Sequence, residues 1–185
     1  MYQDKSLLPR EAIRLAALGI LAAAPKSYAA LAAEVRNFTS RIAGPSLELM
    51  GTSIQLLRYE GFIAPGGADE EFVLTDKGRA ELMQLLRAPL RPPMNDVGRL
   101  VLALKFRFMH LLPAEDRAIQ IAMMIEVCEI ELARLVDLRA QHAGEPGYLI
   151  EWLDREIGAV EDRLEWLRGF LVRLEPALRS DAGRR

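Results

Sequence analysis

Four residues between positions 52 and 59 carry hydrogen-bonding groups of the kind that contact DNA bases. They are Thr52, Ser53, Gln55 and Tyr59. A Gln amide can bond to adenine through both of its polar atoms, and Ser or Thr can bond to either kind of base edge. An ordinary solvated helix face has the same composition. We predict that these side chains contact bases, provided that their helix presents them outward.

Cations suited to phosphate contacts lie before, within and after this segment. A hydroxyl at the start of a helix is a further donor, because it lies beside free backbone N–H groups. Surface Lys and Arg are more often simply solvated, so each remains a candidate. The candidates are Lys26, Arg36, Arg41, Arg58 and Lys77, with Ser46 as the hydroxyl.

The charge distribution permits DNA binding without requiring it. The net charge is −2, but residues 1–107 carry 14 basic and 11 acidic side chains, whereas residues 108–185 carry 10 and 15. The first part is mildly basic and the second acidic, so any nucleic-acid surface is expected in the first part.

No residue pattern for catalysis is present in the sequence. It has no Gly-rich phosphate loop and no Ser or Cys beside a His, and its histidines, His110 and His142, have no ligand-spaced partner. We therefore expect no enzyme activity, no cofactor and no metal site. Cys128 is the single cysteine and is predicted to be a buried apolar residue.

Targeting signals are also missing from the sequence. The longest uncharged apolar run is the 11 residues 15–25, whereas a membrane span needs roughly 20. The start MYQDKSLLPR does not have the pattern of a secretory signal. A cytoplasmic location is therefore expected.

The first 90 residues have the pattern of a winged helix-turn-helix domain. Breaks at Pro25, at Gly44-Pro45-Ser46 and at Gly61 separate three amphipathic segments, and Ser27 is a suitable N-cap for the second. Two β-prone runs, 62–64 and 72–74, flank a Gly-rich turn, and Thr75 can cap a helix over 76–87. Helices followed by a two-stranded wing are typical of this fold.

Beyond a Pro-rich linker at 91–94, the remaining chain is predicted to be helical. Helices are expected over 95–112, from Pro113 to about His142, and from Pro146 to about Glu175. The expected fold is mainly α: a winged helix-turn-helix domain (1–90), then a long-helix dimerisation domain (95–176) and a frayed tail (177–185).

A heptad-like apolar stripe runs along the last helix, and a similar stripe runs along the preceding helix. The preceding helix also has a second apolar line through Ile119 and Ile130. A helix that is apolar on two sides must bury both. We predict a homodimer; the alternative is that helix 95–112 covers the second face within one chain. The predicted interface residues are Ile125, Leu132, Leu149, Leu153, Ile157, Val160, Leu164, Leu167 and Leu171.

Aromatic residues of the C-terminal half are candidates for binding a flat aromatic effector. They are Phe106, Trp152, Trp166 and Phe170, and Trp166 and Phe170 are neighbours at i and i+4. Core or interface packing is the more frequent role of such residues.

The chain resembles the PadR family of bacterial regulators. The resemblance is carried by AALGILAAAPKSYAALAAEV, GPSLELMGTSIQLLRYEGFIA and FVLTDKGRAEL, and by LLPAEDR, IELARL and GYLIEWLDREIGAVEDRLEWLRGFLVRL farther on. It implies a homodimer whose C-terminal helices intertwine, a third helix that enters the major groove, and repression relieved by a small, often phenolic, molecule.

One departure from the family concerns the wing, which is usually rich in Arg and Lys. Here it contains Asp69, Glu70 and Glu71, and carboxylates repel phosphates. The resemblance and the polar residues between 52 and 59 predict a dimeric DNA-binding transcriptional regulator, acting as a repressor, whereas the acidic wing favours a different function. The alternative is a protein-interaction module, an antirepressor or adaptor, with weak or no DNA binding.

Overall fold

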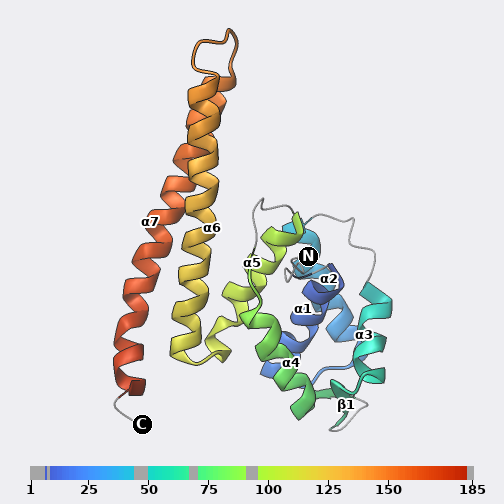
Figure 1. Ribbon diagram of the computed structural model, residues 1–185. Helices are drawn as coiled ribbons and strands as arrows, with labels where there is room; N and C mark the ends of the chain where they lie inside the picture. Colours follow the sequence, from blue (N-terminus) through green and yellow to red (C-terminus); the bar gives the residue numbers. More distant parts are fainter. Residues whose placement is uncertain (1–6, 8, 44–49, 67–70, 91–95, 183–185) are drawn as a thin grey trace, which may run out of the picture. The chain divides into compact units, whose positions relative to one another are not determined.

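The computed structural model describes residues 7, 9–43, 50–66, 71–90 and 96–182, and these fall into two compact units (Figure 1). The first unit contains the helices α1 to α5 with a small sheet, and the second contains α6 and α7. The described residues are mainly helical with a two-stranded wing, so the predicted fold class is confirmed.

Helix α1 (Pro9–Ala23) is the centre of the first unit. It packs against α2 (Tyr28–Ala43), α3 (Met50–Tyr59), α4 (Asp76–Arg87) and α5 (Asp96–Phe108). Its segment Leu15–Leu21 is buried throughout. The uncharged, Ala-rich sequence of this segment allows such burial, because a helix surrounded by others must be apolar on all sides.

The wing consists of β1 (Ile63–Pro65) and β2 (Phe72–Leu74), antiparallel with Ile63 opposite Leu74. On its other side, β2 pairs with Lys26 in the connection between α1 and α2. The Lys26 N–H donates to the Phe72 carbonyl at 3.2 Å, and the Phe72 N–H donates to the Lys26 carbonyl at 2.8 Å. The connection before α2 and the wing therefore share backbone hydrogen bonds.

The capping residues predicted from the sequence occupy their expected places. The Thr75 hydroxyl accepts from the Gly78 N–H at 3.0 Å at the start of α4, and the Ser27 hydroxyl accepts from the Ala30 N–H at 3.3 Å. Gly61 has φ +76° just after α3, a left-handed conformation that favours glycine. The predicted opening of α3 at 44–49 lies outside the described residues.

The structure differs from the predicted domain division at α5. This helix belongs to the first unit, together with the 3₁₀ turn Met109–Leu111 that follows it, so the second unit begins at Pro113 instead of 95. The reason is burial, because Leu100, Leu104 and Phe108 enter the winged-helix core. Phe108 packs so closely on α1 that a Cβ added at Gly19 would be 2.5 Å from the Phe108 ring.

The second unit is a hairpin of α6 (Ala114–Gln141) and α7 (Leu149–Ala182), which pack along each other (Figure 1). Ion pairs join the two helices, including Arg163 to Glu131 at 3.5 Å and Arg168 to Glu129 at 2.7 Å. No helix among the described residues is long and apolar enough to cross a membrane.

The predicted end of the last helix was wrong. The helix was expected to end at Pro176 and residues 177–185 to fray, but α7 continues to Ala182. A proline removes one backbone hydrogen bond without ending a helix outright when the carbonyl it frees is satisfied in another way. The Ala, Leu and Arg that follow are good helix formers.

Candidate nucleic-acid interface

Helix α3 has one face in the core and one face in solvent. Ile54 and Leu57 are each 1% exposed and fix the helix against the first unit. Gln55, Arg58 and Tyr59 are exposed, and Tyr59 is 91% exposed. Because a turn contains 3.6 residues, Gln55 and Tyr59 lie away from the anchored side, whereas Arg58 lies at its edge, about 40° around the helix from Ile54. The outward orientation predicted for Gln55 and Tyr59 is therefore found, and Arg58 is exposed beside them.

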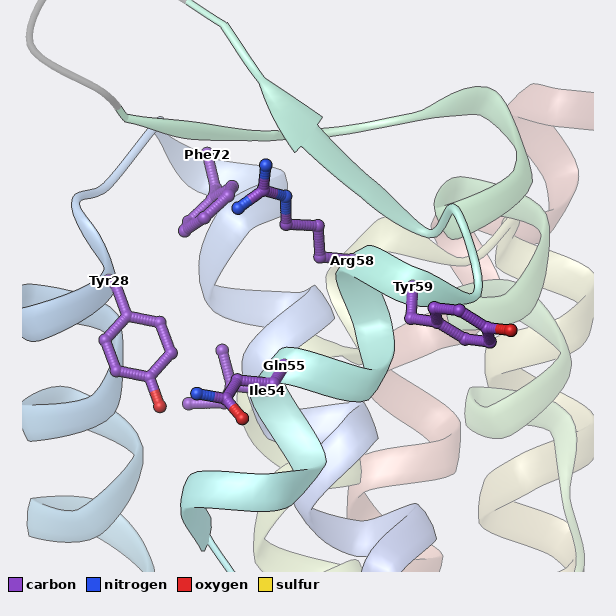
Figure 2. A pocket seen from close by; sticks show the side chains of 6 residues that line it. All are labelled: Tyr28, Ile54, Gln55, Arg58, Tyr59 and Phe72. Carbon is purple, nitrogen blue, oxygen red and sulfur yellow. The ribbon is translucent and has the colours of Figure 1, made fainter.

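An open cleft of about 580 Å³ lies beside this face, between α3, the start of α2 and the wing (Figure 2). Figure 2 shows Tyr28 and Phe72 on one side of the cleft and the α3 residues opposite, with the Tyr59 ring pointing away from the others. The Arg58 guanidinium lies over the Phe72 ring, 6.0 Å from its centroid. The lining residues are Tyr28, Ile54, Gln55, Arg58, Tyr59 and Phe72.

The candidate phosphate-binding cations differ in what they contact. Arg36 and Arg41 are exposed on α2, and Arg58 is exposed on α3. Lys77 donates to the Glu60 carbonyl at 2.7 Å and lies 4.9 Å from the Phe62 ring centroid, so it also holds the end of α3.

Lys26 belongs to an ion-pair cluster that sequence analysis did not identify. Its ammonium lies 3.1 Å from Glu34, which also accepts from Arg107 at 2.5 Å. Burial alone raises the pKa of Glu34, but the hydrogen bonds and charges of Lys26 and Arg107 hold it below its ordinary value. No sequence signal joins positions 26, 34 and 107, because only the packing of α5 on α2 brings them together.

Three further predicted contacts are not described at the side-chain level. Ser46 lies outside the described residues. Thr52 and Ser53 belong to α3, but their side chains also lie outside what the structure describes. The predicted acidic wing is described only at Glu71, which is half-buried, and Asp69 and Glu70 are not described.

The stripe predicted as the contact between two chains is in part already used within one chain. Leu153, Val160, Leu164 and Leu167 are 0–3% exposed in the single chain. These four side chains were expected in a contact between chains, but in the structure they are buried within one chain. The reason is that α7 packs along α6 through this apolar stripe. The other predicted interface residues are half-buried or exposed: Ile125, Leu132, Leu149, Ile157 and Leu171.

A separate set of apolar side chains on the hairpin is exposed. Ile119 and Ile130 on α6 are 50% and 51% exposed, and Trp166 and Val172 on α7 are 48% and 61% exposed. Ile119 and Ile130 belong to the second apolar line of the sequence.

Of the predicted ligand residues, the structure brings only two together. The Trp166 and Phe170 rings lie 5.7 Å apart between centroids, and Arg173 lies over Phe170 at 5.2 Å. Trp152 is two heptads away on the same helix, about 21 Å along its axis. Phe106 is a half-buried residue of α5, in the first unit.

No group of His, Cys, Asp or Glu side chains that could hold a metal ion lies in the described part of the chain. Cys128 is buried on α6, as predicted, and burial raises the pKa of its thiol. The exposed side chains of α3 and the cleft beside them form the candidate functional site.

A family model for putative AphA-like transcriptional regulators matches residues 2–171. The chain belongs to this AphA-like family. The match extends across both units, and it confirms the class predicted from the sequence, a transcriptional regulator. No curated protein matches the chain.

Solved structures of PadR regulators also match this AphA-like chain, at low similarity. The PadR of Bacillus subtilis is 16% identical with a TM-score of 0.41, covering 92% of this chain and 98% of the other. A PadR-like regulator from Bacillus cereus is 21% identical with a TM-score of 0.40, covering 89% and 98%. The B. subtilis PadR complex with operator DNA is 18% identical with a TM-score of 0.36, covering 88% and 98%.

Proposed function

We propose that this AphA-like regulator binds duplex DNA as a homodimer through the exposed face of α3 and represses transcription. The observation that carries the proposal is the division of α3 into an anchored side, with Ile54 and Leu57, and an outward side, with Gln55 and Tyr59. An α-helix fits the major groove of B-DNA, where a Gln amide distinguishes adenine.

The neighbouring cations support the same surface. Arg36 and Arg41 are exposed on α2, the helix that precedes α3 in the chain. In a helix-turn-helix, the helix before the recognition helix crosses the DNA backbone, where guanidinium groups bind phosphates. Base contacts are therefore assigned to α3 and phosphate contacts to α2.

The exposed apolar side chains of the hairpin support a homodimer. Exposed apolar side chains such as Ile119, Ile130, Trp166 and Val172 are costly to leave in water, and a second copy of the hairpin can cover those that share a side. Two copies would then present two α3 helices to DNA.

The test is fluorescence anisotropy with labelled duplex from upstream of the gene, at two salt concentrations. We expect Gln55→Ala to lower the preference for that duplex over an unrelated one, because a base contact is lost.

Arg41→Ala should weaken binding to both duplexes, because a phosphate contact is lost. The slope of the logarithm of the binding constant against the logarithm of the salt concentration should also decrease by about one. Arg155→Ala on α7 removes the same charge from an exposed site and should change neither property.

Docking of a protein partner on α3 is the second candidate function. Leu56 is 50% exposed on the same helix as Tyr59. This exposed apolar surface of α3 is not required for contacts with DNA phosphates, whereas a protein partner can bury it. Failure of the wild-type protein to bind any duplex at low salt, with folding intact, would exclude the first function and favour this one.

Release by a small aromatic effector completes the proposal. Trp166 and Phe170 are the candidate site, since their rings already lie together. Quenching of tryptophan fluorescence by a phenolic compound, lost in Phe170→Leu, would support this site. Unchanged fluorescence across a panel of phenolics would exclude it.

A further inference from the structure

We propose that Glu34 acts as an internal substitute for a DNA phosphate: it holds the ammonium of Lys26 and so lowers the affinity of the protein for every duplex. The effect on duplex binding rests on the proposed function, whereas the hold on Lys26 does not. Glu34 itself contacts no DNA in this proposal. It is a positioning residue that acts through Lys26, one of the candidate phosphate contacts.

The carboxylate of Glu34 receives cations from two other elements. Glu34 lies on α2, Lys26 lies in the connection between α1 and α2, and Arg107 lies on α5. The Lys26 ammonium is 3.1 Å from the Oε2 atom of Glu34, and the Arg107 guanidinium donates to the Oε1 atom at 2.5 Å. A phosphate presents the same kind of charged oxygens, and Lys and Arg are its usual partners. The two cations therefore form an anion site that the chain fills with its own carboxylate.

The position of Lys26 places this anion site beside the candidate interface. Lys26 and Phe72 exchange two backbone hydrogen bonds as an antiparallel pair. Residues paired in this way have their side chains on the same face of the sheet, with Cβ atoms about 4.5–5.5 Å apart. Phe72 lines the cleft next to α3, and so does Tyr28, which follows Lys26 closely in the chain (Figure 2). The Lys26 side chain therefore begins at the border of the surface assigned to DNA.

Lys26 is the cation that can exchange one anion for another. Arg107 also lies over the rings of Phe38 and Phe108, at 4.8 and 5.0 Å from their centroids, so further contacts fix its guanidinium. Lys26 has no ring contact of this kind in the described part of the chain. The side chains of Lys26 and Glu34 are 30% and 34% exposed, so a phosphate can reach the ammonium. Neutralising Glu34 would therefore release Lys26 and leave Arg107 in place.

The hold of Glu34 on Lys26 is expected to matter more for DNA binding than for folding. Partly exposed ion pairs contribute little to stability. Burial raises the pKa of Glu34, but the hydrogen bonds and charges of Lys26 and Arg107 hold it below its ordinary value, so the carboxylate stays ionised at neutral pH. A lysine bound to a phosphate adds about 0.9 to the salt dependence of duplex binding. Because Glu34 removes this contribution, a larger share of the affinity depends on base contacts.

The first experiment measures duplex binding by fluorescence anisotropy, with the full chain and two labelled duplexes, one from upstream of the gene and one unrelated. Glu34→Gln keeps the size of the side chain and removes its charge. We expect it to bind both duplexes about fivefold more tightly at about 0.1 M salt, and to increase the salt slope by about 0.9. Unchanged affinity in Glu34→Gln, with the wild type bound to DNA, would overturn the proposal.

Asp154→Asn is the matched control. Asp154 is the ion-pair partner of Arg139 in the second unit, so this variant also neutralises a carboxylate that holds a guanidinium. It should change neither the affinity nor the salt slope. An equal gain in Asp154→Asn would show an effect of net charge alone and would overturn the assignment to Glu34.

A double-mutant cycle identifies Lys26 as the released cation. Lys26→Met should have little effect in the wild type, where Glu34 holds the ammonium, and should remove the whole gain in the Glu34→Gln background. Effects of net charge add, whereas an exchange of partners does not. Additive changes would overturn the proposal. Glu34→Ala should give the same gain as Glu34→Gln, and it replaces that variant in the cycle if circular dichroism shows that the amide disturbs folding.

The last experiment measures the salt concentration at which each protein elutes from immobilised heparin, a polyanion without bases. Glu34→Gln should elute at higher salt than the wild type, and the double variant with Lys26→Met should lose this difference. If no variant binds duplex but this order of elution is found, the proposed function fails and the role of Glu34 stands. Identical elution of all three proteins would overturn the role of Glu34, whether or not the wild type binds duplex.

Discussion

Lys105 is a charged residue in the apolar core of the winged-helix unit. Its side chain is 1% exposed, and its amine donates to the Leu86 carbonyl at 2.5 Å, near the end of α4. Burial lowers the pKa of Lys105 from 10.5 to about 7. The folded chain therefore releases this proton at a pH where the unfolded chain still holds it.

We predict that Lys105 makes the stability of the protein rise with pH. Between pH 7 and pH 10.5 the unfolded state binds more protons than the folded state, so the free energy of unfolding increases with pH and the stabilisation is lost as the pH falls towards 7. Relative to Lys105→Met, the slope should reach up to about 1.4 kcal/mol per pH unit. Urea unfolding followed by circular dichroism at several pH values measures it, and parallel curves for the two proteins would contradict the lowered pKa.

Gly78, near the start of α4, is predicted to tolerate no side chain. A Cβ there would lie 2.0 Å from the Phe62 carbonyl oxygen, which is backbone and cannot turn aside. Gly78→Ala should cost about 1–3 kcal/mol, as overpacking does in other cores. Gly158→Ala is the matched control, because a Cβ at that position would have nothing within 4 Å and alanine favours the helix by up to about 1 kcal/mol. Thermal melting of both variants would show opposite shifts.

At the scale of elements, Thr75 joins the wing to α4. Its hydroxyl accepts from the Gly78 N–H and donates to the Gly61 carbonyl at 2.8 Å. We expect Thr75→Ala to destabilise the protein by about 1–2 kcal/mol, whereas Thr75→Ser retains the hydroxyl and most of the stability. Thermal melting followed by circular dichroism compares them, and equal losses would show that the methyl group matters and the cap does not.

The elements predictable from the sequence were those defined by neighbours along the chain. The cap at Thr75, the glycine at Gly61 and the pairing of the two short strands depend on a few adjacent residues, and each is found. The place of α5 was not predictable in this way, because its apolar side could have met either unit. What decides it is the fit of Phe108 against Gly19, 89 positions earlier in the chain.

The candidate site was predictable only in part, for the same reason. Helical spacing was enough to place Gln55 and Tyr59 outward. The cleft required Tyr28 and Phe72 from two other elements, and sequence spacing does not bring these rings to α3. Likewise, the apolar stripe of α7 correctly indicated a packed seam, but a stripe has the same spacing whether its partner is α6 or a second chain.

At the scale of the whole molecule, the exposed residues of the hairpin carry the prediction of a dimer. Ile130→Asp should convert the protein to a monomer and weaken DNA binding, because a carboxylate would be buried at the contact between copies. Ile130→Leu keeps the apolar surface and should remain dimeric. Sedimentation equilibrium at micromolar concentration distinguishes the two states. A monomeric wild type, or a dimeric Ile130→Asp variant, would contradict this place for the interface.

The hydrogen bonds between Lys26 and Phe72 have a consequence for how the protein avoids self-association through its wing. They pair with one edge of β2, while β1 pairs with the other edge. Among the described residues, β1 is therefore the edge strand of the sheet. It ends in Pro65, which has no N–H to donate to an incoming strand. Unprotected edge strands pair with strands of other chains and start aggregates. In this wing the connection before α2 and a single proline oppose such recruitment.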